Sequence, residues 1–179
     1  MSKKIFQINF DFKYAYADIV ESINNTSALD LSDETPELFS DFKYGWLTKE
    51  SNIIPDTIVI MSEVLGFNEK GLSLVIDIIP SLSVNQISVG SHKYNMLCNL
   101  VRKNACLNLK KSKVKKLSNG DIMEIQNPVF YPGEYPTLFK VEEMPMSFFC
   151  TETFKDVIES NSISGLTFKE CPIKSKSWF

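Results

Sequence analysis

Histidine is almost missing from this chain of 179 residues, since His92 is the single one. One imidazole excludes His-rich metal sites and the catalytic motifs that are built on two histidines. The seven glycines are scattered and form neither a G-x-G-x-x-G motif nor a phosphate-binding loop. The sequence therefore disfavours a nucleotide-binding enzyme, and we predict no metal, no cofactor and no catalytic residues.

Paired cysteines are missing as well, because no C-x-x-C occurs in the sequence. A zinc knuckle or a disulfide framework needs cysteines at close, regular spacing. We therefore predict four buried, reduced thiols. They are Cys98, Cys106, Cys150 and Cys171.

Long apolar runs do not occur either. Residues 72–79, among the longest, are interrupted by Asp77 and fall short of the roughly 20 residues that a membrane span needs. The first residues alternate polar and apolar side chains, whereas a signal peptide carries a continuous apolar segment. We therefore predict a cytoplasmic protein without a membrane span.

No excess of positive charge is present, because 19 Lys and Arg face 22 Asp and Glu, with a net charge of −3. The chain as a whole therefore has no basic field that would attract nucleic acid or anionic lipid. Its 44% hydrophobic and 23% charged residues are typical of a folded soluble protein. The length predicts a single domain over residues 1–179.

In the N-terminal half the patterns predict a mixture of strands and short helices. Residues 4–12 alternate in the manner of a half-buried strand. A short helix is expected at 16–23, and a turn or helix start at 32–38. The apolar face of the first strand is Phe6, Ile8, Phe10 and Phe12.

The next segment predicts a strand, a turn and a helix. Residues 55–62 are β-branched and apolar, residues 66–68 break the run, and a helix follows, capped by Asn68 and ended by Pro80. Its predicted apolar stripe is Leu72, Val75, Ile76 and Ile79.

From residue 84 onward, short apolar runs between polar turns predict an antiparallel sheet. Asn119 and Gly120 indicate a tight turn, because both accept the positive φ that hairpin turns require. The chain then ends in a strand, a helix that begins after Thr151, and a strand at 166–171. The fold class is therefore α+β, mostly antiparallel sheet with a few helices, ending in a strand-helix-strand unit. The other predicted strands are 86–89, 94–101, 107–109, 122–125, 138–141 and 147–150.

An acidic segment lies between residues 14 and 42, where seven acids occur without any Lys or Arg. The spacing does not match a calcium loop or a two-metal site, so a solvated acidic face is favoured. The same charges suit a basic protein partner. Its candidate contacts are Asp30, Asp33, Glu34, Glu37 and Asp41, with Trp46 and Trp178 as aromatic candidates. A core role is favoured for Trp46, and the two roles are about even for Trp178.

A basic segment follows, with seven cations and no acid from residue 102 to residue 116. A solvated loop between strands is the favoured interpretation, since no aromatic side chain interleaves the run as in single-strand binders. A nucleic-acid-binding module is the alternative. Its residues are Arg102, Lys103, Lys110, Lys111, Lys113, Lys115 and Lys116. A hydrolase that pairs His92 with Cys98 or Cys150 is the least favoured hypothesis.

The C-terminal residues carry a resemblance to a known family. Residues 149–159, a strand leading into a Thr-capped helix, are followed by Ser164-Gly165-Leu166-Thr167-Phe168. This order resembles the eleventh immunity family of bacterial polymorphic toxin systems, once a domain of unknown function. The likeness covers residues 55–171, with 1–54 matching poorly and 172–179 forming a tail. It implies a protein that is not an enzyme and that neutralises a cognate toxin by direct stoichiometric binding.

Overall fold

The structure is a computed structural model that describes residues 4–47 and 51–175, and these residues form two compact units. Unit 1 contains residues 1–8, 101–155 and 168–179, and unit 2 contains residues 9–100 and 156–167. Trp178, one of the aromatic candidates, lies outside the described residues. Among the helices of the described segments, none is long and apolar enough to cross a membrane.

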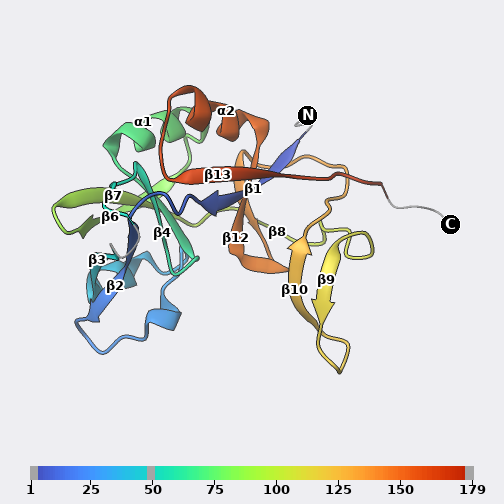
Figure 1. Cartoon of the computed structure of the whole chain (residues 1–179), viewed down its shortest axis with the longest axis horizontal. Helices are drawn as coiled ribbons and strands as arrows, with labels where there is room; N and C mark the ends of the chain where they lie inside the picture. The colour runs from blue at the N-terminus through green and yellow to red at the C-terminus, as the bar shows by residue number, and fades with distance from the viewer. Residues whose placement is uncertain (1–3, 48–50, 176–179) are drawn as a thin grey trace. The chain divides into compact units, whose positions relative to one another are not determined.

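Unit 1 is built on a five-stranded sheet and a separate hairpin (Figure 1). The sheet order is β13-β1-β12-β11-β8, and the hairpin pairs β9 with β10. Phe130, Phe139 and Phe149 meet edge-on or tilted in its core, with ring centroids 5.2 to 6.2 Å apart. The strands are β1 (Ile5–Phe10), β8 (Arg102–Lys103), β9 (Lys113–Lys116), β10 (Ile122–Asn127), β11 (Leu138–Val141), β12 (Met144–Thr151) and β13 (Leu166–Cys171).

Unit 2 is built on a six-stranded sheet of order β2-β3-β6-β7-β5-β4. Its pairs are antiparallel except for β3 and β6, which lie parallel. The strands are β2 (Tyr16–Ser22), β3 (Phe42–Leu47), β4 (Thr57–Ile60), β5 (Val64–Phe67), β6 (Ser83–Val89) and β7 (His92–Cys98). The helices are α1 (Glu69–Ile78), the 3-10 turns η1 (Ala28–Asp30) and η2 (Pro36–Asp41), and α2 (Glu152–Ser160), which unit 1 shares.

Most local predictions are confirmed. Asn68 caps α1 by accepting a hydrogen bond from the Gly71 amide at 3.0 Å, and β12, α2 and β13 follow in the predicted order. Gly120 adopts a φ of +93° in the turn between β9 and β10. All four cysteines are buried free thiols. The α+β class with mostly antiparallel sheet therefore stands.

Three local predictions are wrong. Residues 16–22 form strand β2 rather than a helix, because they pair with β3 along most of their length. Residues 66–68 are not simply a break, since residues 64–67 form β5. Residues 107–109 contribute one isolated bridge, Leu107 to Phe130, instead of a strand.

Two predicted apolar faces also need correction. Phe12 lies beyond the end of β1 and is 73% exposed. In α1 the buried positions are Gly71 and Val75, whereas Ile76 faces solvent. Gly71 takes part in the buried face because the Phe67 ring lies against it, at 2.7 Å from where a Cβ would stand.

Asp56 fastens the loop after α2 to the start of β4. Its carboxylate accepts hydrogen bonds from the Ser164 amide at 2.9 Å, the Ser164 hydroxyl at 2.8 Å and the Asn68 side chain at 2.8 Å. The Lys70 ammonium lies 3.8 Å away. Burial raises the pKa of Asp56, but the hydrogen bonds and Lys70 outweigh burial and hold that pKa below its ordinary value.

We predict that Asp56→Asn lowers the free energy of unfolding by about 1–3 kcal/mol at neutral pH. A carboxylate with a lowered folded-state pKa stabilises the fold above its unfolded pKa of about 4, and this contribution is lost as the pH falls through the folded value. Urea unfolding measured from neutral to acid pH should therefore show the free energies of unfolding of the wild type and the Asp56→Asn variant converging. The control is Asp77→Asn on the exposed end of α1. A difference that stays constant into strong acid contradicts the prediction.

Candidate functional site

Charge is divided unevenly between the two units. Counting the sequence within the stated bounds, unit 2 carries 15 acids and 5 lysines, for a net charge of −10. Unit 1 carries 7 acids and 14 Lys and Arg, for a net charge of +7. The overall value of −3 therefore conceals one strongly acidic and one strongly basic unit. Fields of this size act on charged partners over a Debye length of about 8–10 Å in physiological salt.

Three of the predicted acidic contacts are exposed in unit 2. Asp30 ends η1, Glu34 lies in the following turn, and Glu37 lies in the first turn of η2. The Thr35 hydroxyl donates to the Asp30 carbonyl at 3.0 Å and thereby holds η1 to the residue that caps η2. The three carboxylates therefore belong to one ordered loop.

Asp33 is different, because it is fully buried and does not lie on the surface where the charge pattern placed it. Its carboxylate accepts a hydrogen bond from the Leu100 amide at 2.9 Å, and its carbonyl accepts one from the Asn99 amide at 2.8 Å. Both bonds fasten the acidic loop to the chain that leaves β7. Asp33 therefore stabilises the fold, and the prediction that it contacts a partner is wrong.

Asp41 also has a structural role. Its two carboxylate oxygens accept hydrogen bonds from the Asn24 amide and the Thr26 hydroxyl, each at 2.8 Å, and its carbonyl accepts the Ile23 amide at 2.7 Å. These bonds hold the loop after β2 against the end of η2. The Asp41 side chain is half-buried, and both of its carboxylate oxygens already accept hydrogen bonds.

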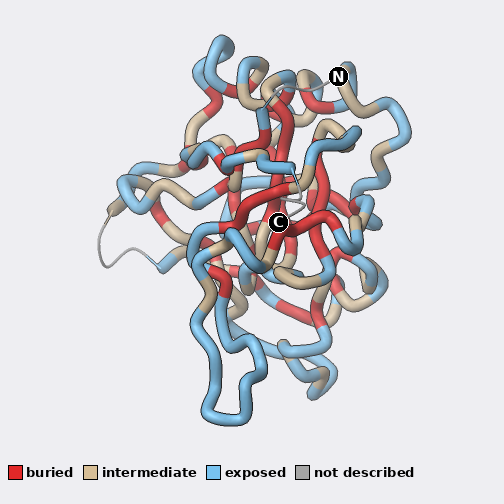
Figure 2. The backbone as a smooth tube through the Cα atoms, turned by 90° about the vertical axis from the view of Figure 1, so that its right-hand side faces the viewer, coloured by how far each residue is buried: buried red, intermediate tan, exposed pale blue. Residues whose placement is uncertain are grey.

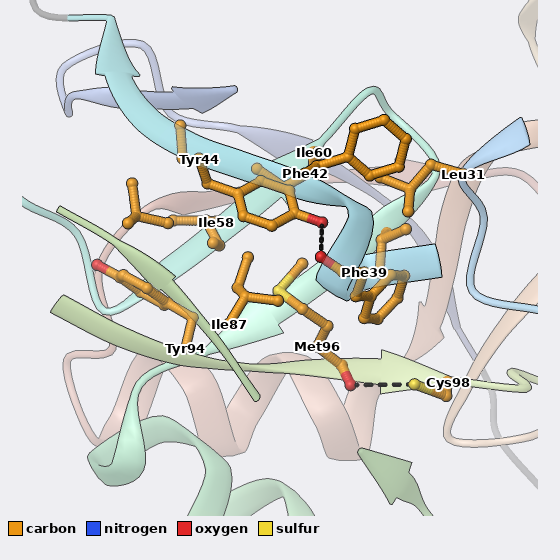
Figure 3. Packing of buried hydrophobic residues seen from close by; sticks show 13 residues of the cluster. Leu31, Phe39, Phe42, Tyr44, Ile58, Ile60, Ile87, Tyr94, Met96 and Cys98 are labelled. Atoms are coloured by element: carbon orange, nitrogen blue, oxygen red, sulfur yellow. Dashed lines mark hydrogen bonds between the residues drawn. The ribbon is translucent and has the colours of Figure 1, made fainter. Parts of the chain in front are cut away.

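A cavity of about 660 Å³ opens beside η2, between β3 and β6. Its apolar lining includes Phe39, Phe42, Tyr44 and Ile87, and Figure 3 shows these side chains within the buried hydrophobic cluster of unit 2. The Tyr44 hydroxyl donates to the Phe39 carbonyl at 3.0 Å, and burial, followed by the nearby Asp41 charge, raises the pKa of Tyr44 far above its ordinary value. We name this cavity the β3–β6 groove.

The polar rim of the β3–β6 groove carries one acid and one base. Glu37 lines the groove and forms no ion pair within the described chain. Lys43 also lines it, but its ammonium lies 2.7 Å from Glu21 on β2. Ser40, Asn85, Gln86 and Ser88 complete the polar lining. The groove therefore joins an apolar floor to a polar rim, in which Glu37 carries the acid that forms no ion pair within the described chain.

Trp46 is half-buried and packs against the core of unit 2. Its ring meets His92 and Tyr94 edge-on, each with centroids 5.9 Å apart. The indole N–H is buried without a hydrogen-bond partner in the described chain. The contacts favour a core role for Trp46 over an interface anchor.

Exposed apolar side chains in and beside β2 and β3 were not identified as a surface by sequence reasoning. Val20 on β2, Leu47 on β3, Phe12 before β2 and Leu29 in η1 are 45 to 87% exposed. A methyl group of Val20 lies 2.8 Å from where a Cβ of Gly45 would stand. Val20 is the bulged residue of β2, where the register with β3 shifts between Ile19 and Glu21. The alternation of β2 was obscured by this bulge, so only the pairing with β3 reveals which residues face outward.

The basic segment is more ordered than the predicted loop. Arg102 and Lys103 form β8 and are half-buried, with the Lys103 ammonium 5.9 Å from the Tyr135 ring centroid. The hairpin of β9 and β10 exposes Lys113, Lys115 and Lys116 (Figure 2). Lys110 and Lys111 are also exposed, and the Lys111 ammonium donates to the Ser175 carbonyl at 3.1 Å.

The hypothesis of a His92 and Cys98 pair is wrong. The two residues stand at opposite ends of β7, six positions apart, which corresponds to about 20 Å along a strand. Burial, followed by the Asp33 charge, raises the pKa of the Cys98 thiol to about 11, which opposes thiolate formation. Cys150 is fully buried in unit 1. Over residues 4–47 and 51–175, no cluster of three His, Cys, Asp or Glu is placed to hold a metal ion.

No family model matches the chain. No curated protein matches it either.

We predict that Asp33→Ala lowers the free energy of unfolding by about 1–3 kcal/mol, because the Leu100 amide would stay buried without an acceptor. Asp30→Ala, at an exposed carboxylate of the same loop, should change it by less than about 0.5 kcal/mol. Chemical denaturation of the two variants beside the wild type measures the difference. Equal stabilities for the two variants would contradict the structural role of Asp33.

Proposed function

We propose that this chain is a cytoplasmic immunity protein that binds a cognate bacterial toxin domain and neutralises it stoichiometrically, without catalysis. The observation that carries the proposal is the acidic rim of unit 2, where Asp30, Glu34 and Glu37 are exposed on one ordered loop beside the β3–β6 groove. Such a surface combines charge that attracts a partner with apolar area that holds it.

A basic toxin domain is the partner that the acidic rim fits. Proteins that act on nucleic acid carry clustered Lys and Arg to contact phosphates, so a nuclease toxin would present the complementary charge. Acidic residues on an inhibitor then accelerate its encounter with the toxin and bind the Lys and Arg side chains that the toxin uses to contact its substrate. The order of residues 149–159 and 164–168, which resembles the eleventh immunity family, points to the same proposal, while no family model matches the chain.

We predict that the triple variant Asp30→Asn, Glu34→Gln and Glu37→Gln slows association with the toxin domain at least about tenfold at low salt. The dissociation rate should change less, because exposed charges act mainly on the encounter. The toxin domain encoded by the neighbouring gene, captured on a surface, is the partner in this rate measurement.

The control makes an equal change in net charge elsewhere on unit 2, with Glu69→Gln, Asp77→Asn and Asp156→Asn, all at exposed residues. The difference between the two triple variants should vanish at about 1 M salt, where the Debye length is about 3 Å. Equal association rates at low salt would remove the acidic rim as the binding surface. If the toxin domain neither binds the wild-type chain nor loses its toxicity in the presence of that chain, the proposed immunity function is wrong.

A second candidate function is nucleic-acid binding through the β9–β10 hairpin. The observation that favours it is the ordered, exposed display of Lys113, Lys115 and Lys116 in a unit of net charge +7. Leu117, Ile122 and Met123 are exposed on the same hairpin.

For this candidate we predict that the wild-type chain binds a DNA duplex with a steep loss of affinity as salt rises. Replacing Lys113, Lys115 and Lys116 by Gln should flatten the slope of log K against log salt by about 0.9 for each phosphate that the variant no longer neutralises. Fluorescence anisotropy across a salt series measures the slope, with Lys70→Gln and Lys93→Gln in unit 2 as controls. The absence of DNA binding at low salt would end this candidate.

A further inference from the structure

The β3–β6 groove lies where two neighbouring strands of one sheet stop pairing. The parallel strands are joined in register at Tyr44 and Val89. Toward their N-terminal ends, Phe42 on one strand and Gln86 on the other line the cavity instead of pairing. η2 closes this end, since the Asn85 side chain donates to the Pro36 carbonyl at 2.9 Å.

The register of β6 shows which backbone groups face the groove. Val89 pairs with His92 across the two-residue turn at Gly90 and Ser91, so this pair directs its amide and carbonyl groups toward each other. Successive residues of a strand direct these groups to opposite sides. Gln86 and Ser88 therefore direct theirs away from β7, toward β3 in the sheet order.

The first residue of β3 also directs its backbone groups into the groove. The Asp41 carbonyl points toward β2, because it accepts the Ile23 amide at 2.7 Å. In a trans peptide the following N–H points the opposite way, and Phe42 has the extended backbone, φ −129° and ψ 147°, that keeps its carbonyl on that side too. Phe42 therefore directs both groups toward β6. The groove is thus lined by strand backbone from both sides.

The side chains of the groove define what can enter. Its floor is aromatic and aliphatic, from Phe39, Phe42, Tyr44 and Ile87, and its rim carries the carboxylate of Glu37. It runs beside residues 85–88 of β6, a length of about 10–13 Å at the rise of a strand. These features match an extended segment of three or four residues that carries an apolar side chain toward the floor and a Lys or Arg toward Glu37.

We propose that the β3–β6 groove receives an extended, positively charged segment of the partner, which inserts as an additional strand between β3 and β6. The inference rests on the proposed function and names the element of the basic partner that is recognised. Backbone hydrogen bonds to Phe42, to Gln86 and to the Ser88 amide supply the affinity, and the Glu37 carboxylate selects a cationic side chain. The inserted segment completes the part of the sheet that these strands leave unpaired.

The test uses the full chain and a defined probe, an acetylated and amidated hexapeptide of alternating lysine and valine. Amide hydrogen exchange is followed with and without the peptide. We expect slower exchange at the Phe42, Gln86 and Ser88 amides, and no change on β2, the outer strand of the sheet. A peptide of alternating glutamate and valine should bind at least about tenfold more weakly.

Two matched variants separate the groove from the strand that carries it. Ser88→Tyr fills the groove, whereas Ser83→Tyr places the same side chain on an exposed position of β6 outside it. We expect Ser88→Tyr to weaken binding of both the lysine–valine peptide and the toxin domain at least about tenfold, and Ser83→Tyr to bind both as the wild type does. Thermal unfolding of each variant confirms that the fold is intact.

The outcomes distinguish the inference from the proposed function. If the toxin domain binds wild type and both variants equally, the groove is refuted while the immunity function stands. Protection that appears along β2 instead of at Phe42 and Gln86 also refutes the groove, in favour of addition at the sheet edge. If the peptide protects the groove but the toxin domain does not bind the wild-type chain, the groove stands and the proposed partner is wrong.

Discussion

The six-stranded sheet of unit 2 depends on one parallel junction, at which Tyr44 of β3 lies beside Val89 of β6. The ribbon of β2 and β3 and the strands β4 to β7 are each antiparallel, and this junction joins them. A short ladder contributes few hydrogen bonds, so burial must hold the two halves together. Tyr44 and Val89 are buried in one core with Tyr94, and the Tyr44 hydroxyl is satisfied by the Phe39 carbonyl. The junction therefore positions η2 and the acidic loop.

The five acids proposed as contacts look alike in the sequence but divide into two groups with different physical roles. Asp33 and Asp41 accept hydrogen bonds from chain segments that they hold in place. Asp30, Glu34 and Glu37 are exposed. A buried carboxylate is tolerated because its acceptors are used, and its removal would leave backbone amides without partners. The exposed acids keep their contact with solvent, and from there their charge acts on an approaching partner.

Local signals were sufficient where a few neighbouring residues decide the structure. Asn68 before α1 and Gly120 in the β9–β10 turn each act through contacts or backbone preferences within a few residues. Strand β5 could not be recognised in this way, because residues 64–67 are buried on both faces and show no alternation. Gly66 stands inside that strand because the Met96 sulfur occupies the space where a Cβ would lie.

The candidate site was visible from sequence only as charge. The acidic segment was identified by its composition, whereas the burial of Asp33 depends on Leu100, 67 residues away. The β3–β6 groove depends on a pairing between residues 44 and 89, which no local pattern reports. The sequence also predicts a helix at 16–23, whereas these residues pair with β3 as a strand.

The exposed carboxylates and the apolar floor of the β3–β6 groove affect different steps of binding. Exposed carboxylates act through a screened field, so they affect how often a partner arrives in a productive orientation. The buried aromatic and aliphatic floor acts only on contact, at about 25 cal/mol for each Å² of apolar surface removed from water, so it affects how long the partner stays. A basic protein with no segment able to enter the groove would therefore meet the rim quickly and leave quickly. Selection among basic partners then falls to the shape of the opening between β3 and β6.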